Sequence, residues 1–258
     1  MRSKLMAVVS LLMIAVLLAT SQVQAAAIKI VTPAFEDHDI SGAVVDFSTA
    51  ETVLGAHSVE MSIPEGVIEG WGLGLNVEVT MPGVSTGLGL SRYAGISFKA
   101  NFLDNPLGAP PVGVPYPEQP AISAPLYVSL ILYDKTNNVW VSMIPTTADA
   151  WGGARMIFLE PDANGWRTAT PVGGSTALWI AWTFEGTVWP GLSPYPGEVM
   201  TLSQWDTYIA ANNLNVKVMK VNIQFGYMHP DYGTTWGTVY VDQLETHGFI
   251  LNFEPTPP

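Results

Sequence analysis

Aromatic residues beside polar ones are the most telling chemical feature of this 258-residue sequence. Between Gly226 and Gly237 the chain reads GYMHPDYGTTWG, which combines aromatic rings with His and Asp. Aromatic rings offer flat apolar faces to the C–H side of a sugar ring, and the polar side chains can hydrogen-bond its hydroxyls. Two further loop-like stretches, AWGG and VWPGLSPYP, also carry aromatic residues. The candidate ligand contacts are therefore Trp151, Trp189, Tyr195, Tyr227, His229, Asp231, Tyr232 and Trp236.

Four other tryptophans lie in segments that read as strand or helix. We expect them to fill the hydrophobic core, because a large aromatic side chain in a regular element buries most of its surface. These residues are Trp140, Trp179, Trp182 and Trp205. The loop aromatics have a structural alternative as well, in which they cover one end of the fold without touching a ligand.

The sequence gives little indication of a catalytic centre. Glycosidases need two carboxylates that flank the scissile bond. The glutamates closest to one another in sequence are Glu60, Glu65, Glu69 and Glu78, and nothing among them marks an acid and a nucleophile. No His-Glu-x-x-His zinc motif occurs. A non-catalytic role is therefore expected, and a polysaccharide lyase or glycosidase remains an alternative.

The composition is that of a folded, acidic chain without disulfides. Hydrophobic residues make up 48% of the sequence and charged residues 12%, so we expect a sizeable core rather than disorder. The net charge of -12 disfavours nucleic acid and anionic lipid as partners. The chain has no cysteine, which excludes disulfides and thiolate chemistry. Neutral glycans, cations and other proteins remain as partners.

The first 25 residues are typical of a signal peptide. Arg2 and Lys4 precede the apolar run LMAVVSLLMIAVLLA, and Val23 and Ala25 have the spacing of a cleavage site. Cleavage after Ala25, or alternatively after Ala27, would leave eight basic and 22 acidic residues, a net charge of -14. The run is short for a membrane anchor of roughly 20 residues. We therefore expect a secreted or cell-surface protein with no integral membrane span.

The elements that would position these residues are mostly β-strands. Nine apolar or alternating segments of strand length are separated by turn residues, since the chain has 24 glycines and 20 prolines. Strands and helices do not alternate, so an all-β, antiparallel β-sandwich is predicted. The predicted strands are Ala43–Phe47, Ser58–Ile63, Leu73–Val79, Gly95–Ala100, Leu126–Tyr133, Val139–Ile144, Ala177–Phe184, Val216–Phe225 and Thr238–Leu244.

One short helix and one long loop interrupt the strands. Thr201 and Gln204 have capping-box spacing, which predicts a helix near residues 201–211. Residues 104–125 include seven prolines and cannot form a helix or a central strand, so a long loop is predicted there. The predicted division is a signal peptide at 1–25, one domain at 26–252 and a Pro-rich tail at 253–258.

Several short motifs follow one another in a distinctive order. They are FED at 35–37, GAHSVEMS at 55–62, YAGISFK at 93–99, the strand segment Leu126–Asp134, NGWR at 164–167, VNIQFG at 221–226 after the predicted helix, and GTVYVD at 237–242. This order resembles the galactose-binding-like superfamily, which includes many carbohydrate-binding modules of secreted glycan-degrading enzymes. The resemblance implies a sandwich of jelly-roll type and glycan binding. The sequence departs from the pattern at His38, where members often have Gly, and in the proline-rich loop.

The resemblance also implies a metal site. In that superfamily the N-terminal acidic motif and the Asp of the last strand often meet at a structural calcium ion, which here implicates Glu36, Asp37 and Asp242. Calcium suits such a site because it binds six to eight oxygens in irregular geometry. The alternative is that Asp242 accepts hydrogen bonds from neighbouring backbone or hydroxyl groups without a metal.

The sequence thus predicts a secreted, non-catalytic module that binds neutral polysaccharide through loop aromatics. A structural or adhesive protein that self-assembles at the cell surface is the alternative, because low charge and many prolines suit a subunit that packs against neighbours.

Overall fold

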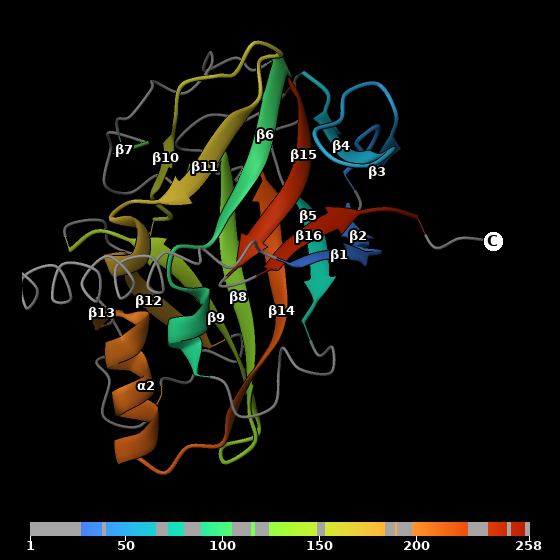
Figure 1. The fold of residues 1–258 in the computed structure, drawn as a ribbon. Coiled ribbons are helices and arrows are strands. Elements are labelled where there is room, and N and C mark those ends of the chain that lie inside the picture. The colour runs from blue at the N-terminus through green and yellow to red at the C-terminus, as the bar shows by residue number, and fades with distance from the viewer. Residues whose placement is uncertain are drawn as a thin grey trace, which may run out of the picture.

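Apolar residues alternate along the central strands, and the chain buries them between two β-sheets (Figure 1). The computed structural model describes residues 27–37, 40–65, 72–79, 89–104, 115–116, 124–148, 153–183, 189, 198–226, 237–246 and 249–255. Within these residues the predicted all-β sandwich is confirmed, and the strand pairs are mostly antiparallel.

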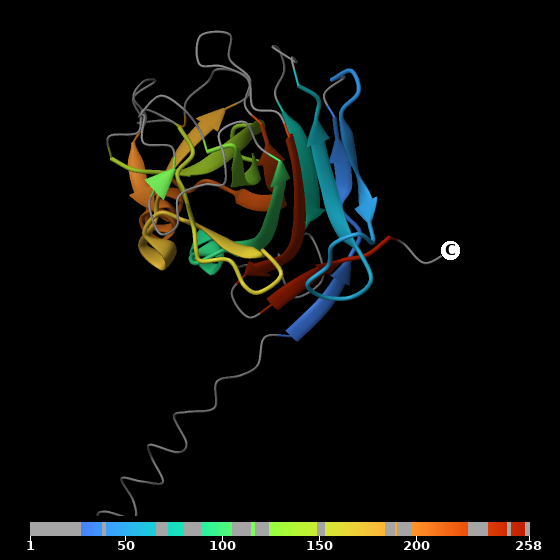
Figure 2. The ribbon, with the colours of Figure 1, turned by 90° about the horizontal axis from the view of Figure 1, so that it is seen from above.

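Sheet A contains nine described strands. Its order is β1 (Ala27–Val31), β16 (Phe249–Phe253), β15 (Gly237–Thr246), β6 (Ser97–Asp104), β11 (Arg167–Pro171), β10 (Met156–Phe158) and β7 (Pro115–Tyr116). Strand β4 (Ser58–Ile63) also pairs with β15, and β3 (Val44–Ser48) pairs with β4. Strand β1 runs parallel to β16, and Figure 2 shows the two side by side at one edge of the molecule.

Sheet B contains seven described strands. Its order is β13 (Val199–Thr201), β12 (Leu178–Thr183), β9 (Val139–Thr146), β8 (Leu126–Asp134), β14 (Val216–Phe225), β5 (Leu73–Glu78) and β2 (Ala34–Glu36). Neighbours in this sheet are antiparallel. In Figure 1, β8 and β14 of sheet B pass behind β6 and β15 of sheet A.

The core lies between the facing sides of the two sheets. Alternate residues of central strands are fully buried there, and they include Val59, Met61 and Ile63 of β4, Leu73, Leu75 and Val77 of β5, and Val221, Ile223 and Phe225 of β14. At one edge the rings of Phe35 and Phe47 meet edge to face with centroids 5.1 Å apart, which joins β2 of sheet B to β3 of sheet A.

All nine predicted strands are confirmed, with ends that differ by a few residues. Seven further strands were not predicted: β1, β2, β7, β10, β11, β13 and β16. All seven have two to five residues, so each is too short to show a clear period in sequence. Strand β7 lies inside the predicted loop at 104–125, and its Pro115 is tolerated because the strand is at the sheet edge.

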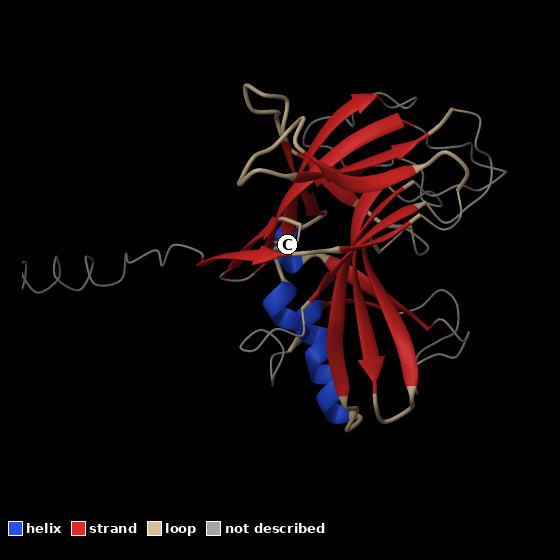
Figure 3. Ribbon diagram, turned by 90° about the vertical axis from the view of Figure 1, so that its right-hand side faces the viewer, coloured by secondary structure: helices blue, strands red, loops and turns tan. Residues whose placement is uncertain are grey.

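The predicted helix is confirmed as α2 (Leu202–Ala211). Thr201 accepts a hydrogen bond from the Gln204 N–H, and Gln204 Oε1 accepts one from the Thr201 N–H at 2.8 Å, which completes the capping box. Asp206 of α2 accepts from the N–H groups of Leu90 and Ser91, at the start of the short 3₁₀ helix η1 (Leu90–Tyr93). A second 3₁₀ turn, η2, spans Gly174–Thr176. Figure 3 shows the helical segments gathered on one side of the strands.

The folded domain reaches further than the predicted boundary at residue 252. Phe253 is fully buried in β16, and Glu254 bonds the β1 backbone through its own N–H. In the described part of the chain, no helix is long and apolar enough to cross a membrane.

Candidate functional site

The side of sheet B that faces away from the core, called here the outer face, carries aromatic and polar side chains. Strand pairing fixes which residues share it. Trp182 of β12 lies opposite Ser142 of β9, and Ser142 lies opposite Ile131 of β8. The next pair along the same face is Tyr133 of β8 with Trp140 of β9.

Two tryptophans on this face keep much of their surface in solvent. Trp140 is 38% exposed and Trp182 is 37% exposed. The Tyr133 ring lies 5.1 Å from that of Trp140 between centroids, at an angle of 45°, and its hydroxyl donates to Asn138. Three aromatic side chains from β8, β9 and β12 therefore form a platform beside the Ser142 hydroxyl.

A row of buried polar side chains continues the outer face across β8, β14 and β5. Ser129 Oγ donates to Asn222 Oδ1 at 3.3 Å, and Asn222 Nδ2 donates to Asn76 Oδ1 at 3.1 Å. All three side chains are at most 8% exposed. Asn76 Nδ2, at the end of this row, has no hydrogen-bond partner in the structure as described. A buried amide nitrogen without a partner carries a desolvation cost.

The expectation that all four strand and helix tryptophans fill the core is half wrong. Trp179 and Trp205 are buried at 1% and 0% exposure, whereas Trp140 and Trp182 lie on the outer face. The signal was present in the sequence. Trp179 and Trp182 are three residues apart on one strand, an odd spacing, so they must point to opposite sides of the sheet.

The loop aromatics lie mostly outside the described residues. This holds for Trp151, Tyr195, Tyr227, His229, Asp231, Tyr232 and Trp236, so their role stays a prediction. Trp189 is described, and it is 2% exposed. Its Nε1–H donates to the buried Asp134 carboxylate at 3.1 Å, and its ring packs against Trp205. Trp189 therefore belongs to the core and offers no open ring face to a ligand.

Asp242 lies where β15 changes its neighbour. Gly237–Val241 of β15 pair with β4, whereas Leu244–Thr246 pair with β16 on the same side. On the other side the register with β6 shifts between Asp242 and Leu244, and Gln243 has φ of 47°. This β-bulge opens a fork between β4 and β16. The residues 49–57 that join β3 to β4, called here the anchor loop, meet the strand at the fork.

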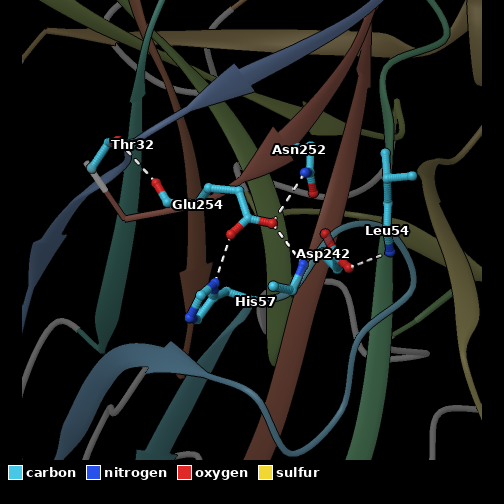
Figure 4. A network of polar contacts seen from close by, with 7 residues as sticks. Thr32, Leu54, His57, Asp242, Asn252 and Glu254 are labelled. Atoms are coloured by element: carbon cyan, nitrogen blue, oxygen red, sulfur yellow. Dashed lines mark hydrogen bonds and ion pairs between the residues drawn. The ribbon is translucent and has the colours of Figure 1, made fainter. Parts of the chain in front are cut away.

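The buried Asp242 carboxylate accepts three hydrogen bonds from backbone N–H groups. Its Oδ2 accepts from Leu54 N–H at 3.0 Å (Figure 4). The same oxygen accepts from Val53 N–H at 2.8 Å, and Oδ1 accepts from Gln243 N–H at 2.7 Å. Burial raises the pKa of Asp242, and these three hydrogen bonds partly oppose the rise. The Asp242 carboxylate on β15 therefore fixes the position of the anchor loop through its hydrogen bonds to Val53 and Leu54.

Glu254 holds the other end of the same loop (Figure 4). Its carboxylate accepts from Ala56 N–H at 2.7 Å and His57 Nδ1 at 2.6 Å, and its backbone carbonyl accepts from Thr32. Burial acts to raise the pKa of Glu254, but the bonds from Ala56, His57 and Asn252 together lower it. Gly55 has φ of +76°, and a Cβ there would lie 2.1 Å from Glu254 Oε1, so any other residue would strain the backbone and displace the Glu254 carboxylate.

The predicted calcium ligands do not fit a calcium ion as they are arranged. Among the described residues no three His, Asp or Glu side chains come together to hold a metal, and Glu36, Asp37 and Asp242 are all described. Glu36 belongs to sheet B and Asp242 to sheet A. The Asp242 oxygens face N–H donors, which supply the positive partners that a cation would otherwise provide. Two buried oxygens near the fork, Ser58 Oγ and Asn252 Oδ1, lack partners in the described structure.

Two of the glutamates considered for catalysis lie in different sheets, and Glu69 lies outside the described residues. Glu60 is on β4 of sheet A, and Glu78 is on β5 of sheet B, where its carboxylate lies 3.9 Å from Lys220 Nζ. These two glutamates therefore do not form a catalytic pair.

The comparisons with known proteins give no family. No protein-family model matches the chain, and no curated protein matches it in sequence.

Proposed function

We propose that this protein is a secreted, non-catalytic module that binds neutral glycan on the outer face of sheet B. The observation that carries the proposal is the pair of half-exposed tryptophans, Trp140 and Trp182, beside Tyr133 and the Ser142 hydroxyl. Aromatic faces stack on sugar rings and hydroxyl groups fix their orientation, which is the usual division of labour in a site of this kind.

Three parts of the proposal rest on the sequence. Secretion rests on the leader at residues 1–25, glycan as the ligand class rests partly on the acidic charge that repels anions, and a jelly-roll arrangement rests on the resemblance to galactose-binding-like domains. Because fold type alone does not decide function, the support for glycan binding comes from the aromatic platform.

The test is binding of the mature domain to a glycan array, followed by titration of the best polysaccharide against Trp182→Ala. We expect affinity to fall by about tenfold or more, since loss of a central aromatic contact costs roughly 1–2 kcal/mol or more. The matched control is Leu103→Ala, which removes a 56% exposed apolar side chain from β6 of sheet A. It should bind as the wild type does.

Trp236→Ala distinguishes binding on the outer face from binding by the aromatic loop that the sequence predicts. If binding survives Trp182→Ala and Trp140→Ala but is lost in Trp236→Ala, the loop is the site and the outer face is not. Binding lost in the tryptophan variants of the outer face, with unchanged melting temperatures, supports the proposal.

A self-assembling surface protein is the second candidate, and one observation favours it. Edge strand β1 presents Ile28 and Ile30 to solvent, at 58% and 68% exposure. Exposed apolar edge strands tend to pair with other chains. Size-exclusion chromatography with light scattering distinguishes the two candidates, because a monomer that is retained on polysaccharide supports glycan binding and an ordered polymer supports assembly.

A further inference from the structure

We propose that the exposed ion pair of Lys220 and Glu78 is a second subsite of the glycan site, where it hydrogen-bonds two neighbouring hydroxyl groups of a sugar whose chain also stacks on Trp182. The inference rests on the glycan-binding function proposed above. It adds to the aromatic platform two residues that select a sugar by its free neighbouring hydroxyl groups.

The strand register places this ion pair in line with the platform. Trp182 of β12 lies opposite Ser142 of β9, which lies opposite Ile131 of β8. Ile131 in turn lies opposite Lys220 of β14, and Lys220 lies opposite Glu78 of β5. These five residues form one straight row across five neighbouring strands, called here the open row.

The open row is accessible along its whole length. Trp182 is 37% exposed, and Ser142 and Ile131 are partly exposed. The side chains of Lys220 and Glu78 keep 30% and 57% of their surface in solvent. By contrast, the buried polar side chains described above, which lie in the neighbouring row, are at most 8% exposed. A ligand on this face is therefore expected to follow the open row.

The length of the row sets the form of the ligand. Lys220 is three strand spacings from Trp182 and Glu78 is four, which at roughly 4.8 Å a spacing gives about 14 Å and about 19 Å. A single sugar stacked on Trp182 is too short to cover either distance. One ligand reaches the ion pair only as a chain of several sugars that crosses the strands, and Ile131 lies halfway along it with apolar surface for their C–H groups.

The chemistry of the ion pair matches two neighbouring hydroxyl groups. Lys220 Nζ lies 3.9 Å from Glu78 Oε1, so the two charged groups stand side by side without a close contact. The ammonium group only donates hydrogen bonds and the carboxylate only accepts them. One hydroxyl group can accept from Lys220 while its neighbour donates to Glu78. The two charges balance each other, so the pair suits a neutral sugar, whereas an acidic sugar would meet the Glu78 carboxylate.

The ion pair is also a position that can be changed without unfolding the domain. An exposed pair of this kind contributes little to stability, because solvent screens the attraction and two long side chains must be held in place. An effect of its removal on binding can therefore be separated from an effect on folding.

The experiment measures affinity by calorimetry against chain length. The probes are neutral disaccharides and hexasaccharides of β-glucan, xylan and mannan, with a uronic acid hexasaccharide as the charged counterpart. For the series that binds, we expect the wild type to prefer the hexasaccharide. Lys220→Met and Glu78→Met should each weaken the hexasaccharide by about tenfold, which is the loss of one hydrogen bond to a charged group, and leave the disaccharide unchanged. Trp182→Ala should weaken both.

Matched controls make the same exchanges on the other sheet. Lys29→Met changes a lysine on β1, and Glu65→Met changes a glutamate at an exposed turn after β4. Both should bind as the wild type does. Lys220→Arg keeps a charged donor and should retain most of the affinity for the hexasaccharide, and thermal melting checks that every variant is folded.

The outcomes separate this inference from the function on which it rests. No binding of any glycan, or binding that survives Trp182→Ala and Trp140→Ala, contradicts both. A length preference that Lys220→Met and Glu78→Met leave unaltered, or equal affinity for disaccharide and hexasaccharide, overturns the second subsite and leaves the glycan function standing. Tighter binding of the uronic acid chain, or a gain of affinity in Glu78→Met, would show that Lys220 holds an anion and overturns the recognition of neighbouring hydroxyl groups.

Discussion

Glu254 shows how one carboxylate can be stabilised by the segment it holds. Its oxygens accept from Ala56, His57 and Asn252, and its chain neighbours place it directly after β16. These bonds favour the ionised form and lower its pKa against the opposing effect of burial. A carboxyl whose pKa is lower in the folded state binds fewer protons there than in the unfolded state. The stability it contributes is therefore present above its usual pKa of 4.5 and is lost as the pH falls through the folded value.

Replacing Glu254 by Gln should remove this pH dependence. At neutral pH the wild type should melt at a higher temperature than Glu254→Gln, and the gap should narrow as the pH is lowered below about 4.5. Melting curves across the acid range measure it. Glu65→Gln, at an exposed turn position, is the control. Its melting temperature should change with pH in the same way as that of the wild type. A gap that stays constant with pH would contradict the assignment.

Asp242 has the opposite linkage. Burial raises its pKa, so its ionisation costs stability as the pH rises above its usual 3.8, while the hydrogen bonds to Val53, Leu54 and Gln243 reduce that cost. The two carboxylates near one loop thus respond to acid in opposite senses.

At the scale of elements, the β15 fork joins the anchor loop and the β4 strand that follows it to β16, which lies almost 200 residues further along the chain. Strand β4, strand β16 and the anchor loop all meet β15 around Asp242. The regular hydrogen-bond ladder of the sheet is interrupted at Gln243. There the Asp242 carboxylate accepts hydrogen bonds from three backbone N–H groups, including that of Gln243 itself. Its removal should therefore affect folding stability rather than ligand binding.

Asp242→Ala should lower the free energy of unfolding by about 3 kcal/mol, because it leaves three partly buried N–H groups without their acceptor. Asp242→Asn should lose less, since it keeps one oxygen acceptor and removes a buried charge. Urea denaturation gives both values. A loss below about 0.5 kcal/mol in Asp242→Ala, within the range of ordinary surface changes, would show that the anchor loop does not depend on Asp242.

The elements that could be predicted from the sequence are those with local signals. The α2 capping box needs only Thr201 and Gln204, and long strands such as β8 and β14 show their apolar pattern directly. The fork could not be predicted, because Asp242 meets Val53 across 189 positions and no local pattern records that contact. The aromatic platform could have been predicted in part, since side-chain alternation on β12 separates Trp182 from Trp179.

At the scale of the whole molecule, cohesion comes from the core between the sheets and from hydrogen-bonded carboxylates. The chain has no cysteine, and the described residues bring no three metal-binding side chains together. The fold is expected to be stable without a cation at Asp242.

Calcium should therefore leave the melting temperature of the mature domain unchanged. The measurement is a thermal melt in millimolar calcium and again in excess chelator, since any ligand that binds the native state raises the melting temperature with its concentration. A rise with calcium that Asp242→Asn abolishes would restore the metal site implied by the resemblance. A rise that Asp242→Asn leaves intact would place a metal elsewhere.

The parallel pairing of β1 with β16 has a mechanical consequence. Five residue pairs, from Ala27 with Phe249 to Val31 with Phe253, join the two strands in the same direction. A pull applied between Ala27 and Phe253 acts on opposite ends of this pair, so it loads the whole ladder in shear and cannot open it one bond at a time. The β1–β16 pair would thus resist a pull along the chain with all of its hydrogen bonds at once.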